Sequence, residues 1–418
     1  MSAIGMALGA APRYARLLRS QYWQPEQLRA YTERHLARTL KAAAKIPFYA
    51  ARLGGSPRPE DFAQLPMLER TDIGGLNASV RSMFPPNRRF LWGASSGSTG
   101  IEAEFLFDRS RVRGRYAARI RYLRAHGWNP LRRTIFLQVR HRHQDSDRVT
   151  HRILPGFMAV TSDLAAQVDQ IVKVDPFYLY TFPSNLDGML RILEETKQQL
   201  PSLRCIFTVS ETVDDTLRQR TRRILGTEIA DNYGTTEGFI AWQCPQGSYH
   251  INAEHVLVEL VDETGRPVAP GEMGRVLITT LENYLMPLVR YDLGDYAIAA
   301  AESTCRCGRT LPLLGGIVGR AISLFRTSDG RIYSTALLLA PVQLIPGMKQ
   351  FQLIQQAPEV FRICYVGDAE LDRTSRSALQ KEFEALLNTR ATIIFERVDE
   401  VARSRSGKFL QALSEVRG

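Results

Sequence analysis

Lysine is scarce in this chain of 418 residues, and so are cysteine, histidine and long apolar runs. Seven of the 54 basic residues are lysines, so arginine supplies nearly all of the net charge of +11. No apolar run approaches the roughly 20 residues that a membrane helix needs, which excludes a helical membrane protein. The first residues lack the basic start of a secretory signal peptide, and we therefore expect a globular protein of the cytoplasm.

The positive charge is spread along the chain rather than gathered in one place. A nucleic-acid-binding face needs clustered basic residues, so we expect no nucleic-acid partner. The densest basic stretch, residues 109–124, alternates arginine with apolar residues in a pattern that predicts a helix over 110–125. We expect its arginines on the solvent side of that helix, with one or two guanidinium groups reaching an anionic ligand.

Length and pattern predict an α/β protein of two or three domains. Residues 20–53 have helical spacing, which Pro47 and the Gly/Pro-rich residues 54–59 should end. Between 134 and 232, short β-rich runs alternate with helical lengths, as in layered α/β folds with crossover connections. The loops after those strands are the expected ligand site, because open sheets bind ligands at the carboxyl ends of their strands.

Two further regions differ from this alternation. Residues 255–262 and 275–281, joined by a turn rich in glycine and proline, predict a β-hairpin. After residue 319, the succession of two strands, a helix and a strand predicts a small α+β unit. Glycines crowd together at 315–320, where we place the boundary between domains of residues 1–318 and 319–418.

A loop of small hydroxyl and glycine residues lies between two short apolar runs at 91–107. Amides and hydroxyls in such a loop can wrap a phosphate, although an ordinary hairpin turn has the same composition. The loop consists of Ser95, Ser96, Gly97, Ser98, Thr99 and Gly100. Four more motifs follow it: NYGTTEG at 232–238, VRYDLGD at 289–295, GR at 319–320 and SRSGKF at 404–409.

In this order, the five motifs resemble those of the adenylate-forming superfamily of acyl-CoA synthetases. Within it, the chain is similar to the phenylacetate-CoA ligase and capsule-biosynthesis ligase-like branch, over nearly its whole length. The resemblance implies a large layered α/β amino-terminal domain with a β-rich hairpin region, which holds the ATP and acyl sites. It also implies a small mobile α+β carboxyl-terminal domain that carries a catalytic lysine.

The resemblance implies a role for each residue of the first two motifs. The Ser95–Gly100 loop would cradle the pyrophosphate part of ATP. Tyr233 would lie against the adenine, Thr236 would contact the α-phosphate and Glu237 would bind Mg²⁺, and the last two are expected to act in catalysis. An aromatic plane and a hard carboxylate suit these partners. The implied nucleotide-binding set also includes Gly234 and Thr235.

The other motifs would complete the site. Asp295 would accept hydrogen bonds from the ribose hydroxyls, and Arg320 would join it. Glu211, after the strand predicted at 204–210, is expected to line the nucleotide pocket. Lys408 would reach the substrate carboxylate and the α-phosphate as charge builds there, which makes it the expected catalytic lysine.

Two departures from the family pattern bear on activity. Many superfamily members have a lysine directly after the hydroxyl-rich loop, whereas this chain has Ile101 and Glu102. The family commonly has Gly-Arg-x-Asp-Asp at the domain junction, whereas Gly319 and Arg320 are followed here by Ala-Ile-Ser. The second departure concerns the domain rotation on which the thioester-forming half-reaction depends.

Two residues before the predicted hairpin and two after it have the ligand types of a structural zinc site. They are Cys244, His250, Cys305 and Cys307. A related Cys/His set recurs in the capsule-ligase-like branch. We expect zinc here, and the alternative is ordinary reduced thiols in a cytosolic protein. The other two cysteines are expected in the cores of apolar strands: Cys205 and Cys364.

The implied activity is ATP-dependent, AMP-forming activation of a carboxylic acid to an acyl adenylate, followed by transfer to coenzyme A. One alternative keeps the adenylation but transfers the acyl group to a carrier-protein thiol, an amine or a hydroxyl. Another is a catalytically inactive nucleotide-binding scaffold. The expected partner is a small carboxylic acid, and a carrier protein and a homodimer remain open. Five aromatic residues offer surface for a flat acid or belong to the core: Trp128, Tyr178, Tyr180, Phe182 and Phe239.

Overall fold

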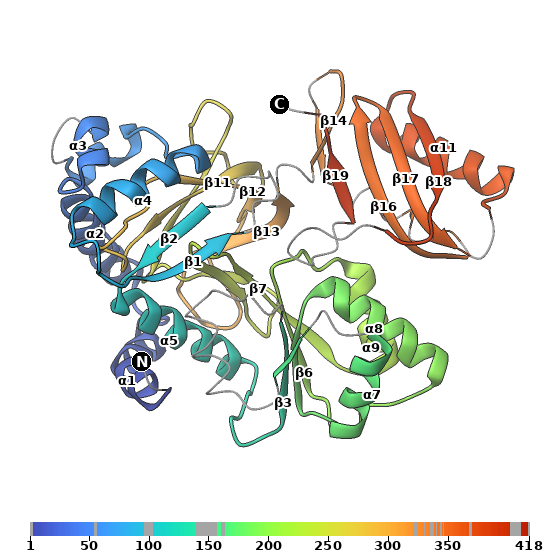
Figure 1. Ribbon diagram of the computed structural model, residues 1–418, viewed down its shortest axis with the longest axis horizontal. Coiled ribbons are helices and arrows are strands. Elements are labelled where there is room, and N and C mark those ends of the chain that lie inside the picture. Colours follow the sequence, from blue (N-terminus) through green and yellow to red (C-terminus); the bar gives the residue numbers. More distant parts are fainter. Residues whose placement is uncertain are drawn as a thin grey trace. The chain divides into compact units, whose positions relative to one another are not determined.

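The computed structural model divides into two compact units, Met1–Ile317 and Val318–Gly418. Helices and sheets occur in both units (Figure 1), which confirms the α/β class predicted from the sequence. The described residues are 3–53, 57–95, 103–138, 157–159, 164–320, 324–329, 331–334, 338–339, 341–342, 345, 347–367, 370–401 and 411–416. No helix among them combines the length and the apolarity needed to cross a bilayer.

The first unit opens with helices α1 (Ala3–Ser20), α2 (Pro25–Ala43), α3 (Pro47–Leu53) and α4 (Ile73–Ser82). Two 3₁₀ turns, η1 (Pro59–Gln64) and η2 (Arg70–Asp72), precede α4. Helix α2 ends at Ala43, shortly before Pro47 as expected, and Pro47 is the first residue of the next helix, α3. Proline suits that position, since the first amides of a helix have no intrahelical acceptor.

A mixed sheet runs through the described part of the first unit, with strand order β10-β11-β12-β13-β9-β8-β7-β6-β5-β3-β4. One side of it is parallel. The parallel strands are β3 (Thr134–Gln138), β4 (Phe157–Ala159), β5 (Tyr178–Thr181), β6 (Cys205–Val209) and β7 (Glu228–Gly234). Helices α7 (Leu164–Val174), α8 (Pro183–Thr196) and α9 (Asp215–Leu225) lie together beside these strands (Figure 1).

The parallel strands are buried on both faces. Alternate residues of a strand point to opposite faces, and two separate cores follow this alternation. Leu179 of β5 and Ile206 of β6 pack with α7, α8 and α9. Tyr180 and Phe207, their chain neighbours, belong to the core on the other face, which includes residues of α5 (Arg109–Ala125). The sheet edge between these two helical layers is where ligands of open α/β folds bind.

The other side of the sheet is antiparallel. It contains β8 (Phe239–Gln243), β9 (Tyr249–Ile251), β10 (Val256–Val261), β11 (Met273–Thr280), β12 (Tyr291–Ala299) and β13 (Leu313–Arg320). β10 and β11 pair from Val256 opposite Thr280 to Val261 opposite Arg275, so the predicted hairpin is confirmed. A separate two-stranded ribbon is formed by β1 (Leu91–Ser95) and β2 (Ala103–Phe107).

The second unit contains a four-stranded sheet of order β18-β17-β16-β19. Its strands are β16 (Met348–Ala357), β17 (Val360–Gly367), β18 (Thr392–Arg397) and β19 (Ala412–Ser414). Helix α11 (Arg373–Leu387) contributes Leu379, Phe383 and Leu387 to its core. A small ribbon of β14 (Leu324–Arg326) and β15 (Ile332–Ser334) belongs to the same unit. The order of strands and helix is the one predicted for the carboxyl-terminal residues.

Candidate functional site

The NYGTTEG motif forms the turn at which the sheet changes from parallel to antiparallel. Residues 232–234 end β7, which pairs parallel with β6 and antiparallel with β8. The Thr235 amide donates to the Gly238 carbonyl at 2.8 Å, and the Gly238 amide donates to Thr235 Oγ1 at 3.2 Å. The hydroxyl of Thr235 therefore closes a tight turn that presents Thr236 and Glu237 at the carboxyl end of β7.

Two arginines of α5 donate hydrogen bonds to the carbonyl oxygens of this turn. Arg111 Nη2 donates to the carbonyls of Thr236 and Glu237 at 2.6 and 2.7 Å. Arg115 Nη1 donates to the carbonyls of Thr235 and Thr236 at 2.7 and 3.3 Å. Three consecutive carbonyls are therefore fixed by charged donors, which form stronger hydrogen bonds than neutral ones.

The expectation that the arginines of this helix face solvent is wrong for two of them. Arg111 is 8% exposed, and Arg121 is 1% exposed in an ion pair with Glu254 at 2.6 Å. Asp108 caps α5 by accepting from the Arg111 amide at 2.8 Å, which sets the start of the helix. Because the cap fixes which face of α5 meets the sheet, the arginines at these positions point inward.

Burial makes the guanidinium group of Arg111 less basic. Desolvation of its guanidinium, aided by the nearby charge of Arg115, lowers the pKa of Arg111 from 12.5 to about 9. Its Cζ atom lies 3.8 Å from the ring centroid of Phe107, the last residue of β2, in cation–π geometry. Arg111 remains protonated at neutral pH, and it links the β1–β2 ribbon to the NYGTTEG turn.

Tyr233 and Asp295 come from motifs 62 residues apart and lie in direct contact. The Tyr233 hydroxyl donates to Asp295 Oδ2 at 2.7 Å, and both residues are buried. Tyr233 belongs to β7 and Asp295 to β12. Two residues to which the family resemblance gives the adenine and the ribose are thus brought to one place.

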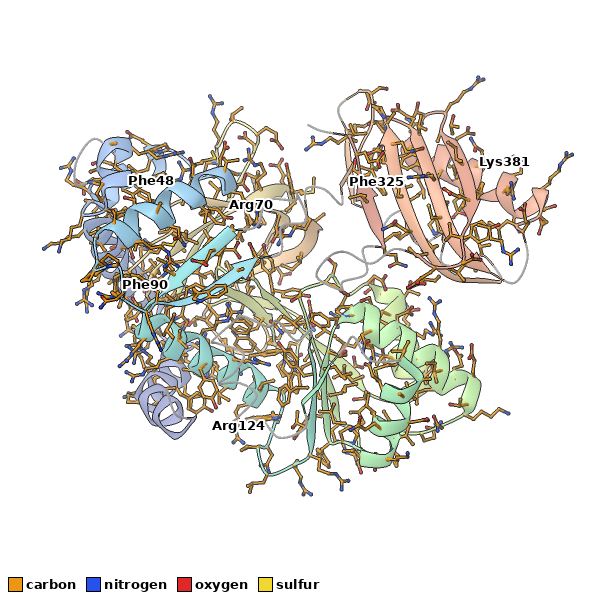
Figure 2. The ribbon with its side chains drawn as sticks, in the orientation of Figure 1. Phe48, Arg70, Phe90, Arg124, Phe325 and Lys381 are labelled. Atoms are coloured by element: carbon orange, nitrogen blue, oxygen red, sulfur yellow. The ribbon has the colours of Figure 1, made fainter. Side chains whose placement is uncertain are left out.

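The β1–β2 ribbon, where the hydroxyl-rich loop begins, lies against the same turn. Thr236 Oγ1 donates to the Ala94 carbonyl at 3.3 Å. A Cβ atom added to Gly93 would lie 3.1 Å from the Thr236 methyl carbon, so this strand residue must be small. Ser95 ends β1 and accepts from Arg70 Nη2 at its hydroxyl, at 2.8 Å. Figure 2 labels Arg70, and the remaining loop residues, Ser96–Gly100, lie outside the described residues.

Glu237 lines a small cavity beside the turn. Glu237 is 4% exposed, and Arg111, His255 and Glu282 are among the other residues that line the cavity. His255 Nδ1 and Glu282 Oε2 lie 2.8 Å apart. A Cβ atom on Gly114 of α5 would lie 2.1 Å from Glu282 Oε2, so glycine is needed for the helix to approach this pair. Two acids, a histidine and arginines therefore surround one small space.

The other expected site residues come from the loop after β6, from the end of β13 and from outside the described residues. Glu211 Oε2 accepts from the Ser184 amide at 2.8 Å, in the first turn of α8. Arg320 ends β13 and belongs to the second unit. Lys408 lies outside the described residues. The structure therefore gathers Ser95, Tyr233, Asp295 and the 234–237 turn in the first unit.

Four potential metal ligands converge at a second place in the first unit. The ligand atoms of Cys244, His250, Cys305 and Cys307 all lie within 4.8 Å of one another. The Cys244 and Cys305 sulfur atoms are 3.7 Å apart, and Cys307 Sγ is 3.2 Å from His250 Nε2. Zinc–sulfur bonds of about 2.3 Å give a tetrahedral edge of about 3.8 Å between two sulfur atoms. The donor set and its spacing therefore fit a four-coordinate zinc ion.

The turns around these cysteines are shaped for such a site. Gly247 and Gly308 follow the first and last cysteine and have φ values of 86° and 78°, which side chains disfavour. The Cys307 amide points at Cys305 Sγ, with 3.5 Å between nitrogen and sulfur. Burial lowers the pKa of His250 to about 4, so its imidazole is neutral, as a metal ligand must be.

The remaining cysteines differ from each other. Cys205 of β6 is buried, and burial raises the pKa of its thiol to about 12. Cys364 of β17 is half-buried with its sulfur 3.7 Å from Glu396 Oε2, so the expectation that it lies in the core is wrong. β17 alternates buried and partly exposed residues, and Cys364 falls on the partly exposed face.

Comparisons with known proteins bear on this geometry. The family model of the AMP-binding enzymes matches residues 149–285. A phenylacetate-coenzyme A ligase of Thermus thermophilus is 26% identical over 350 residues, which are 77% of this chain and 77% of that protein. The phenylacetate-coenzyme A ligase of Escherichia coli is 24% identical, over 72% of this chain and 74% of that protein.

The match to the AMP-binding enzymes and the ligase relatives support the adenylate-forming superfamily. Over about three quarters of its length the chain is similar to the phenylacetate-coenzyme A ligases. A crystal structure of 2-hydroxyisobutyryl-CoA ligase in complex with 2-HIB-AMP matches the fold of this chain with a TM-score of 0.77. That match has 19% identity and covers 95% of this chain and 93% of the other.

Sequence reasoning missed three contributions to the candidate site. Arg111 and Arg115 were expected to face water, and His255 carried no signal in the sequence. Arginines at positions 111, 115 and 119 are four residues apart, a spacing that puts them in one row along a helix. The Asp108 cap and this row together could have indicated that a charged face of α5 meets the sheet.

Proposed function

We propose that this protein activates a carboxylic acid with ATP to an acyl adenylate and then transfers the acyl group to coenzyme A. The observation that carries the proposal is the convergence on the NYGTTEG turn. Asp295 contacts Tyr233 at 2.7 Å, and the start of the hydroxyl-rich loop contacts Thr236 at 3.3 Å. The match of residues 149–285 to the AMP-binding enzymes supports the same reading, and the similar proteins named above are coenzyme A ligases.

The proposed first step joins two anions. A carboxylate oxygen attacks the α-phosphorus of ATP, a new oxygen–phosphorus bond forms and pyrophosphate leaves with the electrons of the broken bond. Charged donors and dipoles must be fixed in advance around the reacting phosphate. Thr236 would contact that phosphate, and Arg111 and Arg115 would hold the backbone of Thr236 in place while Lys408 supplies the positive charge.

The chemistry of Glu237 fits a magnesium ligand. Its carboxylate is buried, and the described residues give it no side-chain hydrogen bond, whereas its backbone is held at 2.7 Å by Arg111. A hard carboxylate oxygen is the ligand that Mg²⁺ prefers. When bound, Mg²⁺ neutralises charge on the phosphates of ATP.

In the proposed second step, a thiol sulfur attacks the carbonyl carbon of the adenylate. A carbon–sulfur bond forms, AMP leaves, and the thiol proton is released. Coenzyme A is the acceptor that we favour because of the similar proteins, and a carrier-protein thiol, an amine or a hydroxyl is the alternative. A scaffold that binds nucleotide without catalysis is the second candidate, favoured by Ile101 and Glu102 in place of the usual lysine. We expect the protein to work in the cytoplasm.

Zinc is the ion we propose for the cluster of Cys244, His250, Cys305 and Cys307. Three thiolates and one imidazole make a closed site without an open position for substrate, which supports a structural role. The ion would tie the turn after β8 and strand β9 to the loop before β13. It would therefore stabilise the antiparallel side of the sheet and take no part in the acyl transfer.

The activity is tested by ATP–pyrophosphate exchange with purified protein and a panel of aryl, fatty and hydroxy acids. We expect exchange with at least one acid, and AMP release when coenzyme A is added. Glu237→Gln should reduce exchange about 100-fold, because a group acting on transition-state charge is lost. The matched control is Glu26→Gln, an exposed residue of α2. ATP binding without exchange for every acid would instead support the scaffold.

A further inference from the structure

Arg119 is the third arginine of the row on α5, and its guanidinium group lies over two adjacent aromatic rings. Its Cζ atom lies 4.5 Å from the ring centroid of Tyr180 and 5.7 Å from that of Phe136. These two residues are paired neighbours on β5 and β3, with ring centroids 5.6 Å apart. These cation–π contacts hold the guanidinium group against the sheet.

Two of its nitrogen atoms are buried without a hydrogen-bond partner. Nε and Nη2 have no acceptor among the described residues, whereas Arg111 Nη2 and Arg115 Nη1 donate to carbonyls of the turn. Arg119 also forms no ion pair within this part of the chain. Buried N–H donors without an acceptor cost about 1–3 kcal/mol each. The Nε and Nη2 donors of Arg119 therefore fit a hydrogen-bond acceptor on a bound ligand.

The two atoms define the shape of that acceptor. Nε–H and the adjacent N–H of Nη2 lie on one edge of the planar guanidinium and point in parallel. This edge matches the two oxygens of a carboxylate, which it binds with two hydrogen bonds. A single carbonyl or hydroxyl would leave one of the two donors without a partner.

The location of Arg119 ties it to the nucleotide motif. Tyr180 OH accepts from Asn232 Nδ2 at 3.5 Å, and Asn232 is the first residue of NYGTTEG. Asn232 Oδ1 is likewise buried without a partner in the described chain. Arg119 is eight residues from Arg111, which is about 12 Å along the helix axis. This span separates the two ends of a small molecule rather than the two oxygens of one group.

We propose that Arg119 binds a second carboxylate on the acid substrate, so that the enzyme activates a dicarboxylic acid at one end. This rests on the proposed function, because it assigns the far end of the acid that is adenylated. The reacting carboxylate lies at the NYGTTEG turn, and the spectator carboxylate lies on the guanidinium edge of Arg119. Phe136 and Tyr180 exclude water from that ion pair.

The experiment measures binding without ATP, by titration calorimetry, so that it does not depend on catalysis. The probes are matched pairs: terephthalate with benzoate, and adipate with hexanoate. The variants are Arg119→Leu, Arg119→Lys, which keeps the charge but lacks the two-pronged edge, and the control Arg109→Leu. Arg109 is an exposed residue in the first turn of the same helix. The same acids are then compared in pyrophosphate exchange.

We expect wild-type protein to bind at least one dicarboxylate about 10- to 100-fold more tightly than its monocarboxylate partner, the range for a hydrogen-bonded charge. Arg119→Leu should remove this preference, Arg119→Lys should retain part of it, and Arg109→Leu should leave it intact. Arg119-dependent binding without exchange would support the carboxylate receptor while contradicting the proposed function.

Three results would overturn the inference. One is equal binding of both members of every pair by wild-type protein, even where exchange proceeds with monocarboxylates. Another is a dicarboxylate preference that survives in Arg119→Leu. The third is a loss of folding stability in Arg119→Leu with no preference in the wild type, which would indicate an ion pair within the chain itself.

Discussion

Arg111 is predicted to position the NYGTTEG turn rather than to stabilise the fold, and Arg111→Met separates the two roles. Methionine keeps much of the side-chain volume but removes the charge and both hydrogen bonds to the carbonyls of Thr236 and Glu237. Two opposing changes in the free energy of unfolding follow from the substitution, and each can be estimated from the structure.

The first change favours the variant. A pKa lowered from 12.5 to about 9 means that burial of the charge costs the folded state roughly 5 kcal/mol at neutral pH. The second change opposes it. The Glu237 carbonyl is left without a donor, at about 1–3 kcal/mol, and the Thr236 carbonyl keeps only Arg115 at 3.3 Å. The cation–π contact with Phe107, worth about 2 kcal/mol when desolvated, is lost as well. The two nearly cancel, so we expect the unfolding free energy to change by less than about 2 kcal/mol.

We expect Arg111→Met to lower the rate of pyrophosphate exchange although the stability of the fold is nearly unchanged. Without Arg111, only Arg115 holds the turn, and it reaches Thr235 and Thr236 but not the Glu237 carbonyl. A displacement of about 1 Å at the reacting phosphate costs about 100-fold in rate. We therefore expect pyrophosphate exchange to fall about 100-fold, while urea denaturation gives nearly the wild-type stability. Exchange within threefold of wild type, or a loss matched by unfolding, would refute this role. Arg109→Met is the control.

Three further predictions concern other parts of the chain. Lys408→Ala should lower exchange about 100-fold with ATP affinity nearly unchanged, and unchanged exchange would contradict its catalytic role. Cys307→Ser should abolish the binding of one zinc ion per chain and lower the melting temperature, and chelation of the wild type should do the same. Cys364→Ser, the control, should do neither. Absence of zinc from the purified protein would contradict the site. Burial raises the pKa of Asp231 from 3.8 to about 6. Between these pH values the folded state therefore binds more protons than the unfolded state. The free energy of unfolding should fall by up to roughly 3 kcal/mol as the pH rises from about 4 to above 6. Asp231→Asn should remove that pH dependence in urea denaturation, and an unchanged slope would show that another group is responsible.

The sequence predicted the elements whose patterns are local. The β10–β11 hairpin follows from two alternating runs and a turn rich in glycine and proline, and the parallel strands follow from β-rich runs between helices. The contact of Tyr233 with Asp295 depends on sheet order, which no local pattern contains. Order along the chain and family resemblance, rather than periodicity, brought those two residues into one hypothesis.

The failures have a common physical origin. Arg111 and Arg121 are buried because their charges meet carbonyls or Glu254, and composition does not distinguish such arginines from solvated ones. Cys364 was misplaced because the face of a strand reverses with every residue. The cavity around Glu237 was invisible because His255 and Glu282 lie 27 positions apart and join only when β10 and the end of β11 come together.

The first helix, α1, supports buried charges that lie behind the NYGTTEG turn. Ser20 of α1 donates to Glu254 at 2.6 Å, and Arg121 donates to the Leu17 carbonyl at 3.3 Å. Arg16 lies 3.2 Å from Glu282, which contacts His255 beside that turn. A shortened protein that begins at α2 would lose the contacts of α1 with Glu254, Arg121 and Glu282 in the interior. Removal of α1 would therefore disturb the residues that lie beside the NYGTTEG turn.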